Sequence, residues 1–289
     1  MKDFTEKIKK ISLVDGMLSD FSIAVVDSLL QFQGEEGVSG NLLELGCYKG
    51  KTALLLGLHL SDGEYVDLVD IYDQLERKIL EENNIQFYLQ TANTENRQKN
   101  LKLKRNSYRF IHCDTSHTYA NTLADLNLSR KLVADKGLIC IDDFANLNYP
   151  GVIPAVYRFL FKRKEFVMFL MTEEKAYICH KSQSKMYNDF VINKLPSELL
   201  SRGFQVTLAR TDNSIFSSTI YIRSTMVGES NYYGGEVFSD LFQSSPFSKK
   251  TRIMYQYRKF LRTYPSFDRG AISWATARII KMVRSLTAL

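Results

Sequence analysis

The chain has few of the residues that staple a fold or interrupt it. Of its 289 residues only five are proline and four are cysteine, and no two cysteines form a C-x-x-C pair. The cysteines lie far apart, each within or beside an apolar run, at Cys47, Cys113, Cys140 and Cys179. This pattern excludes a zinc ribbon and a disulfide framework, and it predicts reduced, packed thiols.

Long apolar segments are missing as well. No run approaches the roughly 18 apolar residues that a membrane-spanning helix needs. The N-terminal stretch MKDFTEKIKKISL mixes both charges and lacks the apolar stretch of a signal peptide. We therefore expect a cytoplasmic protein without a transmembrane segment.

What is present is the composition of a globular protein. Apolar residues make up 45% of the chain and charged residues 24%, and no internal repeat recurs at a fixed period. A chain of this length can bury a sizeable core. It suits one α/β domain with an appendage, or two small domains.

The net charge of +6 comes from the C-terminal tail. Residues 249–289 contain ten Lys or Arg and one Asp, which gives +9 there and about −3 for the rest of the chain. The tail, residues 247–289, also carries aromatic residues and the amphipathic segment AISWATARIIKMVRSL. We expect this segment to dock on the domain or on a second subunit of a homo-oligomer; an anionic membrane surface is the alternative.

Strands and helices are predicted to alternate along most of the chain. Residues 3–33 are predicted to be helical, with GMLSD as a break before the second helix. The predicted strands that follow are NLLELG, YVDLVD, IQFYLQ, YRFIHCD, GLICIDD, FVMFLM and KAYICH, and weaker signals at FQVTLA and STIYIR come after Ser182. The helix TYANTLADLNLSRKLVAD is expected to stop at Gly137. Alternation of this kind predicts a parallel sheet with helices on both faces.

Acidic residues stand where several of these strands end. In a sheet of this kind ligands bind at the carboxyl ends of the strands. The acids at those positions are Glu44, Asp70, Asp114, Asp142 and Asp143. We therefore expect the functional site at that edge of the sheet.

The stretch NLLELGCYKGKTALLLG, residues 41–57, contains a glycine loop with competing interpretations. A P-loop needs four residues between its glycines, whereas only three separate Gly46 from Gly50. A dinucleotide loop would have glycine in place of Glu44, whose carboxylate would repel a pyrophosphate. Glu44 suits a cationic ligand, and Asp70, twenty residues after Gly50, suits a ribose diol. S-adenosylmethionine offers both features, and a P-loop-like NTPase is the alternative.

Several motifs occur together in a characteristic order: LLELGCYKGKTA, DLVD, FIHCDTSHTYANTLADLNLSRKLVADKGLICIDDF and PGVIPAVYRFL. They resemble the class I S-adenosylmethionine-dependent methyltransferases, closest to the metal-dependent O-methyltransferase branch with D-x-x-H-x-Y and D-D motifs, which has sugar, natural-product and catechol-type members. The resemblance covers roughly residues 40–182. It implies a Rossmann-like α/β fold with a mostly parallel seven-stranded sheet, an N-terminal helical segment (1–39) and an α+β C-terminal extension (183–289).

The resemblance also implies the residues of the site. The cofactor would be held by Glu44, Gly46, Cys47, Tyr48, Gly50, Asp70 and Asn93, although Asn93 could equally belong to an ordinary polar loop. Mg²⁺ would be held by Asp114, Asp142 and Asp143, which match the ligand positions of the catechol type. One departure is notable: relatives often have D-G-D-H where this chain has D-T-S-H at 114–117, so one acid is missing.

Elementary chemistry supports a catalytic interpretation of these residues. Three adjacent carboxylates repel one another unless a cation or a proton joins them, and a bound Mg²⁺ would lower the pKa of an acceptor hydroxyl. Alternatively, Asp143 caps the next helix and only Asp142 faces the site. His117, three residues after Asp114, is a candidate general base, with a solvated or capping role as the alternative.

Three further histidines are predicted to be structural. His112 lies inside its strand, where we expect it to pack against a helix. No partner is evident in the sequence for His59 or His180.

The leading hypothesis is an S-adenosylmethionine-dependent O-methyltransferase that acts, with Mg²⁺, on a hydroxyl of a small molecule such as a sugar or a natural product. The first alternative is a module that binds the cofactor without transferring methyl. A nucleic-acid acceptor is not expected, because the chain has neither an N/D-P-P-Y motif nor a basic stripe beside the proposed site. Pocket residues carry no recognisable code for the acceptor.

Overall fold

The structure is a computed structural model, and it describes residues 2–94, 100–210, 219–224 and 236–237. The described residues belong to one compact unit that ends at Val237. The basic tail at 247–289 lies outside them, so its docking stays a prediction. In the described part of the chain, no helix is both long and apolar enough to cross a membrane.

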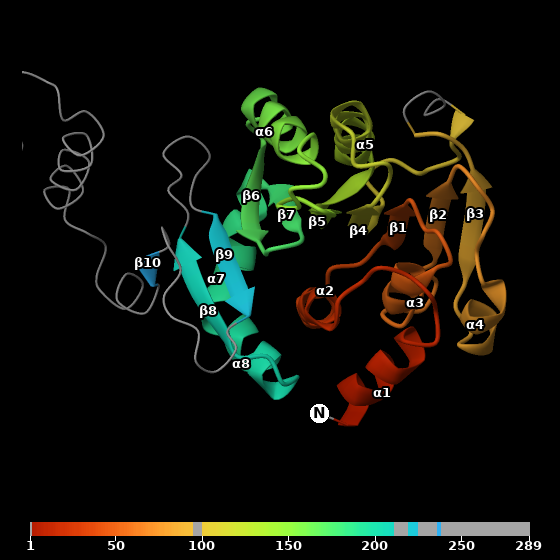
Figure 1. The fold of residues 1–289 in the computed structure, drawn as a ribbon, viewed down its shortest axis with the longest axis horizontal. Helices are drawn as coiled ribbons and strands as arrows, with labels where there is room; N and C mark the ends of the chain where they lie inside the picture. Colours follow the sequence, from red (N-terminus) through yellow and green to blue (C-terminus); the bar gives the residue numbers. More distant parts are fainter. Residues whose placement is uncertain (1, 95–99, 211–218, 225–235, 238–289) are drawn as a thin grey trace, which may run out of the picture. The chain divides into compact units, whose positions relative to one another are not determined.

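Eight α-helices are described, and they lie on both faces of a central sheet (Figure 1). Their bounds are α1 Lys2–Ile11, α2 Asp20–Glu35, α3 Lys51–Gly57, α4 Arg77–Glu82, α5 Tyr119–Leu132, α6 Val152–Lys162, α7 Ser184–Asn193 and α8 Leu195–Ser201. Helices α5 and α6 pack side by side on one face, and α2 and α3 lie on the other. The predicted break at GMLSD is confirmed, since it falls between α1 and α2.

One sheet contains all ten described strands, in the order β10-β8-β9-β6-β7-β5-β4-β1-β2-β3. Their bounds are β1 Asn41–Leu45, β2 Val66–Asp70, β3 Phe87–Thr91, β4 Tyr108–Cys113, β5 Val133–Ile141, β6 Phe166–Met171, β7 Ala176–His180, β8 Val206–Arg210, β9 Ile220–Ser224 and β10 Glu236–Val237. The neighbours from β3 to β5 all pair in parallel, and β7 runs antiparallel between β5 and β6. The predicted Rossmann-like α/β class is therefore confirmed.

The number of strands differs from the prediction. The seven predicted strands are all present, but β9 pairs with the outer edge of β6, and β8 and β10 continue the sheet beyond it. An uncovered strand edge offers unpaired backbone groups, and the extension satisfies those of β6. The domain boundaries predicted at 39/40 and 182/183 stay predictions.

The predicted end of helix α5 was wrong. The helix ends at Leu132, and the backbone of Val133 is already extended because this residue pairs with Tyr108 of β4. Gly137 lies inside β5 and does not stop the helix. A Cβ atom at this position would lie 2.6 Å from the carbonyl oxygen of Tyr108, so the close approach of the two strands requires glycine.

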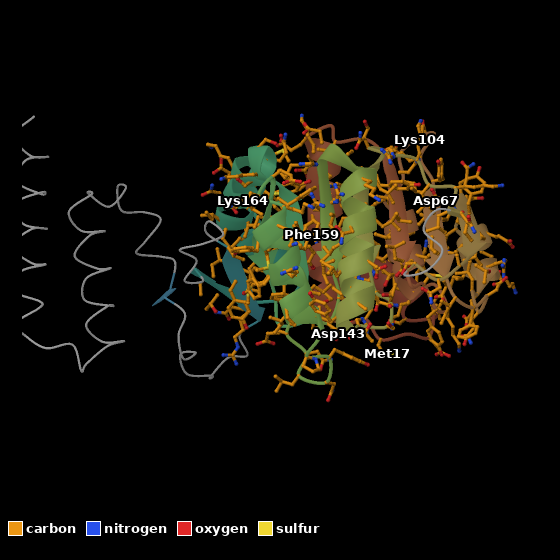
Figure 2. The ribbon with its side chains drawn as sticks, turned by 90° about the horizontal axis from the view of Figure 1, so that it is seen from above. Met17, Asp67, Lys104, Asp143, Phe159 and Lys164 are labelled. Carbon is orange, nitrogen blue, oxygen red and sulfur yellow. The ribbon has the colours of Figure 1, made fainter. Side chains whose placement is uncertain are left out.

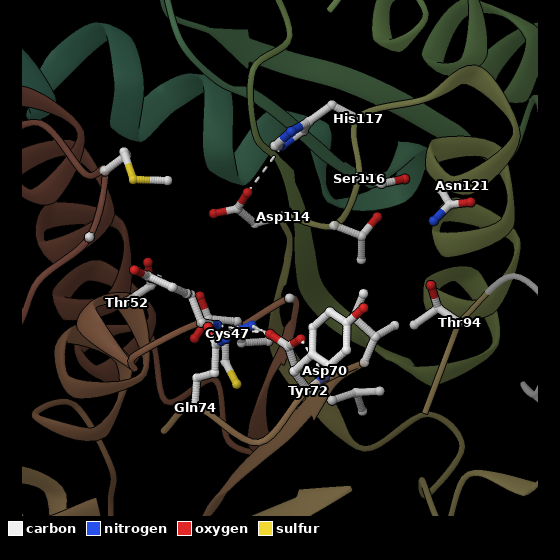
Figure 3. A pocket seen from close by; sticks show the side chains of 18 of the residues that line it. Cys47, Thr52, Asp70, Tyr72, Gln74, Thr94, Asp114, Ser116, His117 and Asn121 are labelled. Atoms are coloured by element: carbon white, nitrogen blue, oxygen red, sulfur yellow. Dashed lines mark hydrogen bonds and ion pairs between the residues drawn. The ribbon is translucent and has the colours of Figure 1, made fainter. Parts of the chain in front are cut away.

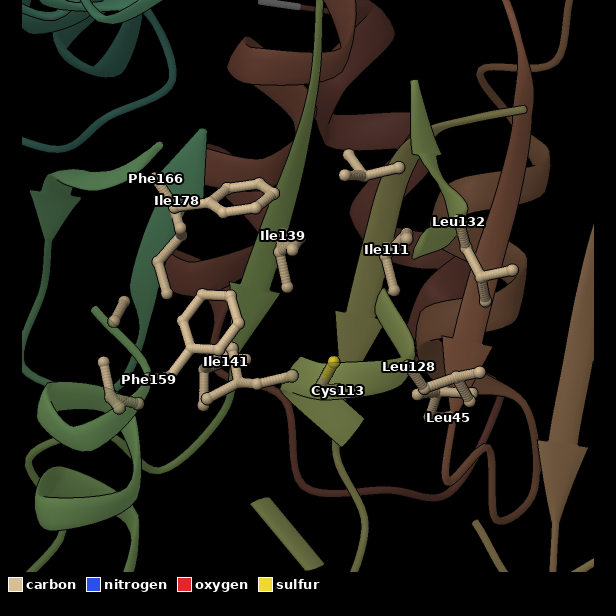
Figure 4. Packing of buried hydrophobic residues seen from close by; sticks show 14 of the residues in the cluster. Leu45, Ile111, Cys113, Leu128, Leu132, Ile139, Ile141, Phe159, Phe166 and Ile178 are labelled. Atoms are coloured by element: carbon tan, nitrogen blue, oxygen red, sulfur yellow. The ribbon is translucent and has the colours of Figure 1, made fainter. Parts of the chain in front are cut away.

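The main hydrophobic core lies between the sheet and helices α5 and α6 (Figure 4). Ile111 of β4 and Ile139 of β5 are fully buried beneath Leu128 and Phe159, which come from the two helices. Burial of each such side chain stabilises the fold by about 1.5–3 kcal/mol. This packing holds the parallel strands in register, and their carboxyl ends form one edge. Met17 and Asp143 lie near that edge, and Lys104 lies at the opposite one (Figure 2).

A buried ion pair lies on the other face of the sheet. Arg109 of β4 is 2% exposed, and its Nη2 donates to Glu64 Oε2 at 2.9 Å and to the His59 carbonyl oxygen at 2.5 Å. Gln33 Oε1 of α2 accepts from Arg109 Nη1 at 3.3 Å. Although burial raises the pKa of Glu64, the hydrogen bond from Arg109 and two backbone amides lower it more. The pair thus joins the sheet to α2 and to the loop after α3.

We expect Arg109→Met to lower the free energy of unfolding by about 3–5 kcal/mol, because the substitution leaves Glu64 buried without its partner. Urea denaturation followed by circular dichroism measures this change. The control is Lys78→Met, whose exposed partner Glu82 lies 3.6 Å away, and which should change the free energy of unfolding by less than about 1 kcal/mol. Equal effects of the two substitutions would contradict the structural role of the buried pair.

Candidate active site

A pocket of about 710 Å³ opens at the carboxyl ends of the parallel strands. Its lining includes the ends of β1, β2 and β4, the loops that follow them, and residues 15–18 between α1 and α2 (Figure 3). This volume is typical of sites for small molecules and cofactors. The predicted site residues that line it are Glu44, Gly46, Cys47, Tyr48, Asp70, Asn93, Asp114 and His117.

The glycine loop is shaped by a close approach between two strands. Gly46 has a φ of 84°, and a Cβ atom there would lie 1.8 Å from the carbonyl oxygen of Asp114. The amide of Asp114 donates to the Leu45 carbonyl at 2.8 Å, which ties the ends of β1 and β4 together. Gly50, with a φ of 95°, caps α3, and a Cβ atom there would meet Leu75 at 2.6 Å. Both glycines are therefore required by the local backbone.

Asp70, at the end of β2, holds the glycine loop in place. Its Oδ2 accepts hydrogen bonds from the amides of Cys47 at 2.8 Å and Tyr48 at 2.9 Å, and its Oδ1 accepts from the amide of Tyr72 at 3.1 Å. A carboxylate has about four acceptor positions, so the side chain can still accept bonds from a ligand. Asp70 thus joins β2 to the glycine loop beside the pocket.

Glu44 lies on the inner wall of the pocket and is 1% exposed. Its Oε1 lies 3.2 Å from Nδ1 of His112, and its Oε2 is buried without a hydrogen bond of ordinary geometry among the described residues, although the nearby Thr52 hydroxyl lowers the pKa of the carboxyl. Burial and the nearby charge of Asp114 raise the pKa of Glu44 well above its usual range. An unsatisfied buried carboxylate favours a ligand with a positive charge or a hydrogen-bond donor.

His117 and Asp114 face each other at the pocket, directly after β4, the strand next to β1 (Figure 3). His117 Nε2 lies 3.0 Å from Asp114 Oδ1 and 3.5 Å from Asp143 Oδ2, and the ring packs on Tyr149 with centroids 4.6 Å apart. Burial lowers the pKa of His117, but Asp114, Asp143 and Asp142 together raise it above its usual value. Burial and the charge of Asp142 raise the pKa of Asp114. The pair can therefore hold and release a proton near neutral pH.

Asp142 lies behind the pocket wall and is paired with a lysine. Its Oδ1 accepts a hydrogen bond from Nζ of Lys175, which is 1% exposed and also lies 3.1 Å from His112 Nε2. Burial raises the pKa of Asp142, but Lys175, His112 and a backbone hydrogen bond together lower it below its usual value. Nothing in the sequence singled out Lys175, because it stands alone in a turn between two strands.

Asp143 and the other histidines differ in part from expectation. Asp143 does not cap a helix: α6 begins nine residues later, at Val152, and Asp143 Oδ1 accepts from Asn146 Nδ2 at 2.9 Å. His112 is buried as expected, but it belongs to a polar chain between Glu44 and Lys175. His59 has a partner that the sequence did not indicate, since its Nε2 lies 2.8 Å from Asp27 Oδ1. The ring of His180 packs on Phe166.

Residues 15–18 form a further wall that the sequence did not predict in this position. Lys51 Nζ donates to the Gly16 carbonyl at 3.1 Å, and Lys49 Nζ pairs with Asp15 Oδ2 at 2.6 Å. The two lysines of the glycine loop thus hold the break between α1 and α2 over the pocket. Lys51, which a P-loop would direct at phosphate, is engaged with a carbonyl oxygen instead.

In the part of the chain that the structure describes, two groups of side chains are compact enough to hold an ion. The ligand atoms of Asp114, His117 and Asp142 lie within 4.8 Å of one another, as do those of Glu44, His112 and Asp114. Both sets include a histidine nitrogen, whereas Mg²⁺ prefers an octahedron of oxygens. In the first set, one oxygen of Asp142 already accepts from Lys175. The donors around the predicted metal site therefore do not fit Mg²⁺ well.

Comparison with known proteins identifies one domain. Residues 43–144 match the family model described as "Methyltransferase domain". They extend from β1 to the turn after β5 and contain the glycine loop, Asp70, Asp114 and Asp142. The prediction of a methyltransferase domain is confirmed for this segment. None of the curated proteins compared with the chain matches its sequence.

Solved structures with a similar arrangement include methyltransferases of low sequence identity. The Podospora anserina methyltransferase PaMTH1, bound to SAH, is 18% identical, with 62% of this chain and 87% of that chain covered and a TM-score of 0.45. The O-methyltransferase from Bacillus cereus in complex with SAH is 16% identical, with coverages of 62% and 89% and a TM-score of 0.45. TomG from Streptomyces achromogenes, an O-methyltransferase in complex with SAM, is 12% identical, with coverages of 62% and 88% and a TM-score of 0.45.

We expect Gly46→Ala to lower the free energy of unfolding by about 3 kcal/mol or more, because the new Cβ atom overlaps the Asp114 carbonyl and the left-handed backbone is strained. Urea denaturation of the full chain measures the change. Gly63→Ala is the matched control, since Gly63 has a φ of 81° but nothing within 4 Å of its Cβ position. It should cost about 1 kcal/mol. A similar loss of unfolding free energy in both variants would contradict the role of the close approach between β1 and β4.

Proposed function

We propose that this protein binds S-adenosylmethionine and transfers its methyl group to a hydroxyl of a small molecule. The observation that carries the proposal is the grouping of two kinds of acidic site around one pocket. Glu44 and Asp70 lie beside the glycine loop, and the Asp114–His117 pair follows the neighbouring strand β4. The match of residues 43–144 to a methyltransferase domain supports the same assignment.

Glu44 and Asp70 suit the charges and hydroxyls of S-adenosylmethionine. The buried Oε2 of Glu44 has no hydrogen bond of ordinary geometry among the described residues, so an ammonium group would satisfy it. Asp70 keeps about one acceptor position for a ribose hydroxyl, while Cys47 and Tyr48 present the backbone of the loop between Gly46 and Gly50. Asn93 lines the pocket after β3, where we place the adenine. A nucleoside triphosphate fits less well, because the pocket is lined by the acids Glu44, Asp70 and Asp114 and because Lys51 is engaged elsewhere.

The Asp114–His117 pair suits removal of a proton from the acceptor. The cofactor supplies an electrophilic methyl group when bound, and a neutral hydroxyl attacks it poorly at pH 7. Since His117 Nε2 faces the carboxylates of Asp114 and Asp143, Nδ1 is the ring nitrogen that takes the acceptor proton. The carboxylates then stabilise the imidazolium that forms. Asp114 orients the base and compensates its charge.

Magnesium assistance was predicted from the resemblance and is not part of this proposal. Asp142 is engaged by Lys175, and Asp114 and Asp143 both lie against His117. We therefore derive no step through a metal ion. His117 alone accounts for proton removal.

The acceptor class follows from the pocket and its surroundings. A hydroxyl of a sugar or of a natural product is consistent with a pocket rimmed by Tyr72, Tyr149 and Asn121, which combine aromatic surface with hydrogen-bonding groups. A module that binds the cofactor without catalysis would have no need of a histidine between two carboxylates. A nucleic-acid acceptor has no basic support among the pocket residues beyond Lys51.

The direct test is transfer of a labelled methyl group from S-adenosylmethionine to a panel of nucleotide sugars, glycosides and phenols. We expect labelled product from at least one hydroxyl compound, with no requirement for added metal. Calorimetry with S-adenosylhomocysteine and with ATP is the companion measurement. Binding of ATP alone would contradict the proposal, and binding of S-adenosylhomocysteine without transfer to any acceptor would favour the binding module.

We expect Asp70→Asn to weaken S-adenosylhomocysteine binding by about 10- to 100-fold, because charge-assisted hydrogen bonds contribute about 1.5–3 kcal/mol each. The amide also cannot accept from both loop amides and a ribose at once. Titration calorimetry measures the affinity. Asp73→Asn is the control, since Asp73 is an exposed carboxylate in the next loop that pairs with Arg77. Unchanged affinity in the Asp70 variant would remove Asp70 from the cofactor site.

We expect His117 to titrate above the ordinary histidine pKa of about 6.5, because Asp114 and Asp143 favour its protonated form. The neutral base is then present only above that raised pKa, so methyl transfer should increase with pH through it. Asp114→Asn should move both the NMR titration of the imidazole and the rate profile to lower pH. His117→Gln should lower the rate by about 10²- to 10⁴-fold while S-adenosylhomocysteine still binds. A profile that Asp114→Asn leaves unmoved would contradict this role.

A further inference from the structure

The acids behind the pocket are joined by a continuous buried chain of polar groups. Glu44 Oε1 lies 3.2 Å from His112 Nδ1, His112 Nε2 lies 3.1 Å from Lys175 Nζ, and Lys175 Nζ donates to Asp142 Oδ1. Glu44, His112 and Lys175 are each 1% exposed or less, and Asp142 is 8% exposed. This series of polar groups extends from Glu44, which is proposed to hold the cofactor, to Asp142, which was predicted to bind metal.

The hydrogen-bond roles along this chain are mutually consistent. The ammonium of Lys175 can only donate, so His112 Nε2 accepts a hydrogen bond from it and carries no proton. The imidazole proton is then on Nδ1, where it is donated to Glu44. Burial and the neighbouring Lys175 lower the pKa of His112, in agreement with a neutral ring. Each group therefore has one defined partner on each side.

The turn between β6 and β7 places Lys175 in this position. Its amide donates to Thr172 Oγ1 at 2.9 Å, and its carbonyl accepts from the Thr172 amide at 2.8 Å. The preceding residue, Glu174, accepts hydrogen bonds from the hydroxyls of Ser19 at 2.6 Å and Ser22 at the start of α2. The backbone that carries Lys175 is thus fixed from both sides, and the ammonium is held at the acids by the fold.

We infer that Lys175 replaces a divalent cation as the positive charge at Asp142 and Asp114, and that the site works without a bound metal. A metal ion on these carboxylates would lie against the ammonium, and two cations at that distance repel strongly. The charges of the other two acids are offset by His117, which pairs with Asp114 and Asp143. This inference deepens the proposed function, but it concerns the charge of the site and does not depend on methyl transfer.

Lys175 acts as a positioning residue in this arrangement. Its contacts orient Asp142 and, through His112, the carboxylate of Glu44 at the cofactor wall. A bound Mg²⁺ would instead offer open coordination positions to an acceptor hydroxyl. An ammonium offers none, so proton removal depends on His117.

The test is a gain of metal binding. The ligand atoms of Asp114, His117 and Asp142 already lie within 4.8 Å of one another, so removal of the ammonium leaves a compact vacant site. We expect the wild-type chain to bind Mn²⁺ no tighter than millimolar, and Lys175→Met to bind it at least about tenfold tighter. Electron paramagnetic resonance of free Mn²⁺ measures both affinities. Lys175→Arg, which keeps the charge, should behave as the wild type.

A double variant and an NMR measurement show whether an ion binds at Asp142. Adding Asp142→Asn to Lys175→Met should abolish the gained binding, which assigns the ion to this site. Micromolar binding of Mn²⁺ by the wild type, or a folded Lys175→Met without gained binding, would overturn the inference. If Lys175→Met does not fold, the NMR signals of the His112 and His117 rings in the wild type decide instead: broadening by Mn²⁺ overturns the inference, and its absence supports it. Failure of methyl transfer would affect only the proposed function, because these readouts require no acceptor.

Discussion

Carboxylates accumulate at one edge of the sheet, and the arrangement of the site depends on how their repulsion is offset. Parallel pairing of β2, β1, β4 and β5 brings Asp70, Glu44, Asp114 and Asp142 to the same ends of adjacent strands. Like charges this close destabilise one another in a partly buried place. Each acid has its own solution: backbone amides for Asp70, His112 for Glu44, His117 for Asp114 and Lys175 for Asp142. Each acid in the site therefore has a different local partner.

Much of this arrangement could be predicted from the sequence because it follows from local patterns. Short, mainly apolar stretches identified the seven strands, and the rule that ligands bind at their carboxyl ends selected the acids. The three-residue spacing between Gly46 and Gly50 argued against a P-loop, and the structure adds that Lys51 bonds a carbonyl. Predictions failed where tertiary pairing overrides local preference, as at Val133, which leaves the helix to pair with Tyr108.

The residues that the sequence did not reveal reach the site from distant segments. Lys175 is 33 residues from Asp142, and it lies beside that acid only because β7 inserts between β5 and β6. Gly16 lies 35 residues from Lys51, and a helix break gives no hint of what will contact it. Periodicity identifies strands and helices, but it does not give their order in the sheet, and strand order decides which side chains meet.

The Lys175–Asp142 and His117–Asp114 pairs have different roles because their cations differ. Lys175 is covalently part of the chain and fully buried, so its charge compensates Asp142 whether or not any ligand is bound. His117 is less enclosed, with 15% of its side chain exposed, and its charge changes near neutral pH. A permanent charge is useful for holding Glu44 and Asp142 in position, whereas a titrating one is required to accept a proton. The fold therefore separates a fixed network behind the wall from a proton-exchanging pair that faces the pocket.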